Sequence, residues 1–313
     1  QQWPHLLPLV KGKLKQDTIV VPHSNVFFAI AADDFMPMGY GTLGIFEMRM
    51  YADDLPVIAW QLDDISYDLT RYVNALADYR AKKAKGISLQ LCRKLPNNKL
   101  PVYKSFSAGN GVIDLSDGKS KKIRIEVYDT RYNKSSVSFF IRGSAVPAEP
   151  KCVQEMLAGK RNVFKNQFMS LVLNEDALYD HICFTSAVRN STNPYSYIYT
   201  VHDNTVPLHT YFDLVLNPKN PIPAALKDKV AVVLKKGATR ISGSAAKVIN
   251  QQVTVSVNEF GDYEIVTDQR APVISTTLKD AQNISKNKIL SFTVRDETTS
   301  VKQCTATVDG QWL

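Results

Sequence analysis

Residues 121–143, KKIRIEVYDTRYNKSSVSFFIRG, decide the fold class of this chain. Residues 122–129 alternate apolar and polar side chains with a period of two, which is the pattern of a strand with one buried and one wet face. A short polar turn follows, and residues 135–143 then supply a second run with strand character. Together they predict a β-hairpin within an antiparallel sheet.

Comparable short runs extend through the rest of the 313 residues. Gly, Pro and Asn interrupt them every 8–12 residues or so, a spacing typical of β-sandwiches. We therefore expect a mainly β protein built of tandem Ig-like or fibronectin-like sandwiches. Proline-containing stretches at GSAVPAEPK (143–151) and DQRAPVIS (268–275) mark the predicted boundaries.

These boundaries predict three parts: a first sandwich over 1–145, a second over 150–270, and the opening half of a third over 271–313. Half of a sandwich buries too little apolar surface to fold alone. We therefore expect that the protein continues past Leu313 or that a partner completes the third sandwich. The chain begins without Met or a signal peptide, so we expect a processed protein or a piece of a longer one.

One long helix is predicted inside the first sandwich, within the stretch WQLDDISYDLTRYVNALADYRAKKAKG at 60–86. Apolar side chains recur there at the i, i+3, i+4, i+7 spacing of an amphipathic helix over about 68–85, and Gly86 supplies its stop. We expect this helix to pack on the sandwich through Leu69, Tyr72, Val73 and Leu76. Its basic end is the predicted contact for an acidic partner, through Arg80, Lys82, Lys83 and Lys85.

The net charge of +8 and the pI near 9.1 allow an anionic partner such as nucleic acid, an acidic wall polymer or lipid headgroups. The basic residues are dispersed and no nucleic-acid recognition motif accompanies them, so a nucleic-acid partner is not expected. An apolar fraction of 44% argues against general disorder. No apolar run is long enough to predict a transmembrane segment.

The four cysteines, Cys92, Cys152, Cys183 and Cys304, form no CxxC pair and match no zinc-site spacing. Small buried apolar residues are the favoured interpretation. A Cys152–Cys183 disulfide can form in an oxidising compartment, but the sequence does not decide the disulfide state of any of the four.

His209 and Asp213 form an HxxxD spacing, but in a strand they would lie roughly 13 Å apart and could not hold one ion. The acidic pairs Asp33-Asp34, Asp53-Asp54 and Asp63-Asp64 suit either calcium ligands or hairpin tips, the latter being commoner. His202-Asp203 is interpreted as a turn. We predict neither catalytic nor metal-ligating residues in this chain.

Tyr195, Tyr197 and Tyr199 share one face of a predicted strand because they recur at a period of two. Such a face can form a stacking surface for sugars or peptides. The same face suits a sandwich core or an inter-domain contact equally well. A stacking surface and a structural role therefore both remain open.

The combined pattern resembles the region that follows the catalytic domain in lysostaphin-like zinc metallopeptidases of Bacteroidota. The segments that carry the resemblance run in order along the chain: DDISYDLTRYVNALADYRAKKAKG, LPNNKLPVY, GNGVIDL, IRIEVYDTRYNKSSVSFFI, PLHTYFDLVLNPKNPIPAALKDKVAVVL, EFGDYEIVTDQRAPVI and TATVDGQWL. The family holds zinc through an HxxxD motif with a central glycine and through a separate HxH. Neither is present here, so no catalytic residue is carried over.

The resemblance implies a C-terminal accessory region without its peptidase domain, in which alone zinc would be expected. It also implies a cell-envelope location, in the periplasm or at the outer membrane, with envelope proteins or the parent's own peptidase domain as partners. Three hypotheses follow: a non-catalytic scaffold, part of an active zinc endopeptidase that cleaves peptidoglycan peptides, or a wall- or carbohydrate-binding module.

Overall fold

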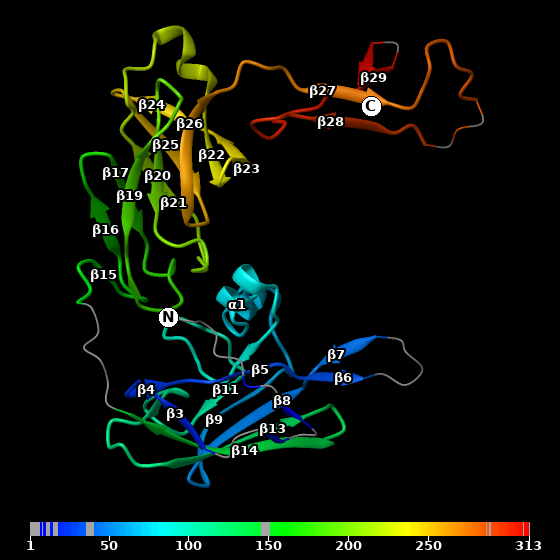
Figure 1. The fold of residues 1–313 in the computed structure, drawn as a ribbon. Coiled ribbons are helices and arrows are strands. Elements are labelled where there is room, and N and C mark those ends of the chain that lie inside the picture. The colour runs from blue at the N-terminus through cyan, green and yellow to red at the C-terminus, as the bar shows by residue number, and fades with distance from the viewer. Residues whose placement is uncertain are drawn as a thin grey trace. The chain divides into compact units, whose positions relative to one another are not determined.

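The computed structural model describes residues 7, 9–10, 13–14, 18–35, 41–144, 151–285, 287, 289–308 and 310–312. It is mainly β, as the sequence predicts (Figure 1). The chain divides into two compact units. Unit 1 comprises Gln1–Lys160, Glu175–Phe184 and Thr205–His209, and unit 2 comprises Arg161–Asn174, Thr185–Asn204 and Thr210–Leu313. The division into 1–145, 150–270 and 271–313 stays a prediction.

Unit 1 is built on a sheet in which six described strands are hydrogen-bonded in the order β11-β9-β8-β13-β14-β3. Their bounds are β3 (Thr18–Val21), β8 (Glu47–Ala52), β9 (Leu55–Gln61), β11 (Tyr103–Ser105), β13 (Lys121–Tyr128) and β14 (Lys134–Gly143). Neighbours run antiparallel except β14 and β3, which are parallel. The first strand of this sheet in sequence therefore pairs with the last.

Shorter antiparallel pairs complete unit 1. They are β1 (Leu9–Val10) with β2 (Lys13–Leu14), β4 (Asn25–Val26) with β12 (Ile113–Asp114), β5 (Ala29–Ile30) with β10 (Gln90–Leu91), β6 (Asp33–Phe35) with β7 (Thr42–Gly44), and β15 (Glu155–Met156) with β18 (Ile182–Cys183). Residues 175–184 belong to unit 1 although they lie late in the sequence, because Asn97 Nδ2 donates to the carbonyls of Glu175 and Leu178.

The hairpin predicted from residues 121–143 is confirmed as β13 and β14. Ile123 and Ile125 of β13 point into the core and are buried. Glu126 points the other way and is also buried, because the Lys134 ammonium and the Arg124 guanidinium cover its carboxylate. The alternation is therefore kept, with an ion-paired cluster on the outer face.

The predicted single helix over about 68–85 is wrong in its continuity. The structure has two short helices instead, the 3-10 helix η2 (Tyr67–Ala75) and α1 (Tyr79–Lys85). Between them Ala77 forms a β-bridge with Gln90, and Asp78 is extended with ψ 91°. Asp78 then caps α1 by accepting the Ala81 N–H at 2.9 Å, so a capping residue interrupts the helical pattern.

The packing predicted for this stretch is confirmed. Tyr72 and Leu76 are buried members of the unit 1 core, and Leu69 and Val73 are half-buried against it. The same core holds Trp60, whose indole N–H donates to the Leu91 carbonyl at 3.0 Å. The apolar face therefore packs on the core as its spacing predicts, although the backbone forms two short helices rather than one.

Unit 2 contains two five-stranded antiparallel sheets among its described residues, which form a β-sandwich (Figure 1). One has the order β16-β17-β21-β25-β24, with β16 (Asn162–Lys165), β17 (Met169–Leu173), β21 (Phe212–Leu216), β24 (Lys247–Ile249) and β25 (Gln252–Val257). The other has the order β19-β20-β26-β22-β23, with β19 (Ser186–Asn190), β20 (Tyr197–Val201), β22 (Val230–Lys236), β23 (Thr239–Ala245) and β26 (Gly261–Thr267). A short 3-10 helix, η3 (Ala224–Lys229), precedes β22.

The last part of unit 2 contains two small antiparallel pairs, β27 (Val273–Thr276) with β28 (Phe292–Arg295) and β29 (Thr307–Val308) with β30 (Gln311–Trp312). Val273, Ile274 and Phe292 are each more than half exposed. The apolar side chains of this hairpin are therefore not gathered into a core of their own.

Across the described ranges, no helix has both the length and the apolar character needed to traverse a lipid bilayer.

Candidate functional site

A groove of about 370 Å³ opens on unit 2. The turn between β16 and β17 supplies Asn166 and Phe168, the strand β19 supplies all five of its residues, Ser186–Asn190, and Tyr197 begins β20. Because β19 is the outermost strand of its sheet, the groove follows an open edge of the sandwich. Its volume lies within the usual range of small-ligand sites.

The turn that carries Phe168 is fixed by hydrogen bonds. Asn166 Oδ1 accepts the backbone N–H groups of Phe168 and Met169, both at 2.8 Å. Asn217 holds the same turn from the neighbouring strand, because its Nδ2 donates to the Gln167 carbonyl at 2.7 Å and its N–H donates to the Phe168 carbonyl at 2.8 Å. The groove wall is therefore preorganised by backbone contacts.

Two aromatic rings form the apolar part of the groove. Phe168 and Tyr197 meet edge to face with centroids 5.5 Å apart. The ammonium of Lys219 lies 5.8 Å from the centroid of the Tyr197 ring. The two rings come from different sheets, so the groove bridges the sandwich at its edge.

The predicted stacking surface of Tyr195, Tyr197 and Tyr199 needs correction. Tyr199 is fully buried, and its hydroxyl donates to the Asn217 carbonyl at 2.6 Å. Burial raises the pKa of Tyr199 to about 12. Tyr195 precedes β20 rather than lying on it, and both Tyr195 and Tyr197 are half-buried. Of the three, Tyr197 lines the groove, while Tyr199, on the same face of β20, is buried in the core.

Charge at the groove is locally balanced. The Arg189 guanidinium pairs with the Asp262 carboxylate, which also accepts the Thr200 hydroxyl at 2.6 Å. Because Arg189 pairs with Ile198 in the sheet and Asn190 pairs with Tyr197, the side chains of Arg189 and Tyr197 lie on opposite faces of the sheet.

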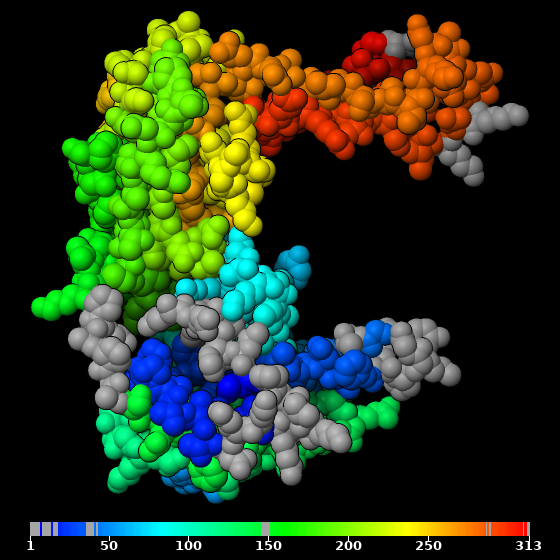
Figure 2. Space-filling model, viewed as in Figure 1, coloured from blue at the N-terminus to red at the C-terminus, as the bar shows by residue number. Residues whose placement is uncertain are grey.

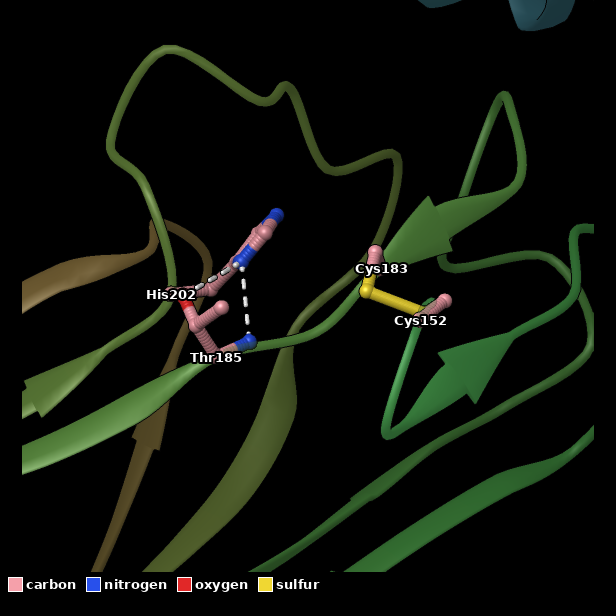
Figure 3. The surroundings of a disulfide bond; sticks show 4 residues. All are labelled: Cys152, Cys183, Thr185 and His202. Atoms are coloured by element: carbon pink, nitrogen blue, oxygen red, sulfur yellow. Dashed lines mark hydrogen bonds between the residues drawn. A yellow bond between two sulfur atoms is a disulfide. The ribbon is translucent and has the colours of Figure 1, made fainter. Parts of the chain in front are cut away.

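His202 lies beyond the end of β20, where its backbone has a positive φ of 51°. Its Nδ1 accepts the Thr185 N–H at 3.3 Å, and its own N–H donates to the Thr185 carbonyl at 2.9 Å. Figure 3 shows this pair with the nearby Cys152–Cys183 disulfide. Burial lowers the pKa of His202 below its usual value, with Asp203 acting in the opposite direction.

This lowered pKa predicts acid sensitivity. The folded state binds the His202 proton less tightly than the unfolded state, so this contribution to stability is present above about pH 6.5 and falls as the pH drops below it. His202→Asn keeps a residue that tolerates positive φ but does not titrate. We expect the stability gap between wild type and His202→Asn in urea unfolding to shrink from pH 7.5 to pH 5.5. His181→Asn, at an exposed histidine, is the control, and a gap that stays constant with pH for His202→Asn would contradict the assignment.

His209 and Asp213 do not serve as the motif that their spacing suggests. The His209 ring stacks on Tyr72 with centroids 4.0 Å apart, and its Nδ1 shares a 2.8 Å hydrogen bond with the Tyr179 hydroxyl. Tyr179 also donates to the Arg71 carbonyl at 3.1 Å, and burial lowers the pKa of His209. Asp213 is an exposed residue of β21. In unit 1, His209 is thus part of an aromatic packing cluster.

The acidic pair Asp53-Asp54 forms a hairpin tip. Both residues have positive φ and connect β8 with β9, as in a two-residue hairpin turn. Asp53 Oδ1 accepts the Lys122 N–H at 2.8 Å, and the Asp54 carboxylate pairs with the Lys122 ammonium at 3.1 Å. Within the described ranges, no group of three His, Cys, Asp or Glu side chains is placed to hold a metal ion.

The basic end of α1 is exposed. Arg80, Lys82, Lys83 and Lys85 all lie at the surface, on a helix visible in cyan in Figure 2. Their contact with an acidic partner stays a prediction.

One segment of the chain matches a known protein family. Residues 154–268, a little over a third of the chain, match the family of Zu5-like domains. No curated protein matches the chain. A solved structure of SGBP-B from the Bacteroides ovatus mixed-linkage glucan utilization locus, in complex with a mixed-linkage heptasaccharide, aligns with 99% of this chain and 67% of its own length, at 10% identity and a TM-score of 0.20. A TM-score of this size does not indicate a common fold.

The sequence did not single out Asn166, Phe168, Arg189 or Asn190. The polar pair within FKNQFMS indicates a turn, but nothing in the sequence couples that turn to Tyr197. Their proximity depends on how the strands of the two sheets are ordered.

Proposed function

We propose that this chain is a non-catalytic interaction region of a cell-envelope protein of the lysostaphin-like peptidase family. In this role its β-sandwich units position a peptidase domain or dock onto an envelope complex. The resemblance described above supports the family, and the match of residues 154–268 to a Zu5-like domain supports a sandwich module within it.

The observation that carries the non-catalytic role is the use of His209. It is the histidine of the sole HxxxD sequence, and its Nδ1 is engaged by the Tyr179 hydroxyl while Tyr72 covers its ring. A zinc site needs several ligands that converge on one point, whereas the neighbours of the His209 ring named here are the phenol of Tyr179 and the aromatic ring of Tyr72. His209 instead fastens residues 205–209 within unit 1.

The Cys152–Cys183 disulfide supports the envelope location. Its Cα atoms are 5.5 Å apart, a separation usual for disulfides. Disulfides persist in oxidising compartments such as the bacterial periplasm and the cell surface. The basic end of α1 offers a contact for an acidic envelope partner.

Metal analysis combined with a hydrolysis assay tests this proposal. The purified chain is loaded with zinc, dialysed and analysed for bound metal, then incubated with purified peptidoglycan while soluble peptides are measured. We expect less than stoichiometric zinc and no release of peptides above a blank. Hydrolysis that a chelator abolishes and zinc restores would instead assign the chain to the active-endopeptidase hypothesis.

A His209→Ala variant distinguishes a packing role of His209 from a zinc-ligand role in the same assay. If His209 has only a packing role, the variant loses thermal stability while metal content and peptide release are unchanged. If His209 ligates zinc, the variant loses bound metal.

A further inference from the structure

We propose that the groove on unit 2 is a binding site for a neutral saccharide, with Phe168 and Tyr197 as its apolar platform and the polar side chains around them as its hydrogen-bonding groups. This function is additional to the scaffold role and does not depend on it. The inference rests on the composition of the groove, its charge and its rigidity.

The groove pairs aromatic rings with polar side chains. Within the described part of the chain, Asn166 Nδ2, the Ser186 hydroxyl and the Asn190 side-chain amide hydrogen-bond to no other residue, although all three line the groove. Sugar rings present apolar C–H faces and a rim of hydroxyls. A site that combines aromatic surface with convergent amide and hydroxyl groups matches both features.

Among the described residues of its lining, the groove carries no ionic group that would select for an anion. Arg189 is the charged residue of its lining, and the Arg189 guanidinium is ion-paired with Asp262 on the face of the sheet opposite Tyr197. An uncharged ligand avoids the desolvation cost that a carboxylate or phosphate would meet here.

The walls of the groove are held in place before any ligand binds. Asn166 Oδ1 and Asn217 hold the turn that carries Phe168, and β-sheet pairing with Asn190 holds Tyr197. Fixed walls reduce the entropy lost on binding, which matters most for weak, hydroxyl-rich ligands. A volume of about 370 Å³ takes a segment of about two sugar rings rather than a long chain.

Calorimetric titration of the whole chain tests the proposal. The probes are chitotetraose and cellotetraose as neutral saccharides, tetragalacturonate as an acidic one, and an extended uncharged peptide. We expect binding of at least one neutral tetrasaccharide at millimolar concentrations, and about a tenfold loss of affinity in Phe168→Ala. Asn190→Ala truncates an exposed side chain at the end of β19 and should also weaken binding several-fold.

Tyr211→Ala is the matched control, because Tyr211 is an exposed aromatic residue of unit 2 outside the groove lining. It should bind like wild type. Thermal unfolding of each variant separates lost binding from lost structure, and if Phe168→Ala fails to fold, Asn190→Ala decides. The proposal is overturned if no neutral probe binds, if all variants bind equally, or if only the acidic probe binds. Binding of the peptide alone would also overturn it, and would assign the groove to strand addition at β19.

Discussion

Gly111→Ala is expected to destabilise unit 1 by about 3 kcal/mol or more, because it combines backbone strain with a steric clash. Gly111 has a φ of 98°, which an L residue adopts only with strain. A Cβ at this position would lie 2.3 Å from the Cys92 carbonyl oxygen and 2.6 Å from the Arg93 Cα. Both are backbone atoms of a packed segment, so neither can move aside cheaply.

Gly118→Ala separates the two causes. Gly118 also has a positive φ, of 65°, but a Cβ there meets no atom within 4 Å. This variant should lose only about 1 kcal/mol, the cost of backbone strain without a clash. Urea unfolding of both variants measures the difference. Equal losses would show that the close approach of Gly111 to residues 92–93 is not a structural constraint.

Trp60→Ala is expected to cost about 3–5 kcal/mol, because it leaves a large cavity in the unit 1 core. Trp60 is 1% exposed and belongs to the cluster that also contains Met48 and Tyr72. The substitution also leaves the Leu91 carbonyl without the indole N–H that it accepts at 3.0 Å. A variant of this kind should show a lower urea midpoint and weaker protection of η2 from hydrogen exchange.

Two further variants make this result interpretable. Trp60→Phe keeps much of the volume and loses the hydrogen bond, so it should cost roughly half as much. Phe106→Ala removes an aromatic ring that is 56% exposed and should change stability by about 0.5 kcal/mol at most. A loss for Phe106→Ala as large as that for Trp60→Ala would mean that the burial of Trp60 is not what stabilises unit 1.

Local patterns predicted the strands because a period of two is a property of neighbouring residues. The predicted strand at residues 122–129 corresponds to β13 (Lys121–Tyr128), and the apolar positions between 69 and 76 packed inward. The predicted helix was too long. Its apolar periodicity continues through Asp78, but in the structure the β-bridge between Ala77 and Gln90 competes with helical hydrogen bonds at that point. The bridge depends on Gln90, further along the chain, so the periodicity of residues 68–85 does not reveal it.

The candidate site was harder to predict. Periodicity shows that Tyr197 and Tyr199 share a face but not whether that face meets solvent or core. The structure buries Tyr199 and brings Tyr197 beside Phe168 through the arrangement of two sheets. The order of strands in a sandwich is set by long-range packing, so the groove residues could not be grouped from their sequence positions.

The parallel pairing of β3 with β14 has a consequence for the order in which this chain acquires its structure. Ser144 hydrogen-bonds the Val21 carbonyl across 123 residues, and Thr18–Val21 pair with Phe140–Gly143. A chain synthesised from its N-terminus must therefore keep β3 unpaired until β14 has emerged. Such non-local closure is slow, and the unpaired β3 is open to pairing with other molecules while it waits for β14. Unit 1 should therefore depend most on chaperone protection late in its synthesis, immediately before the first strand meets the last.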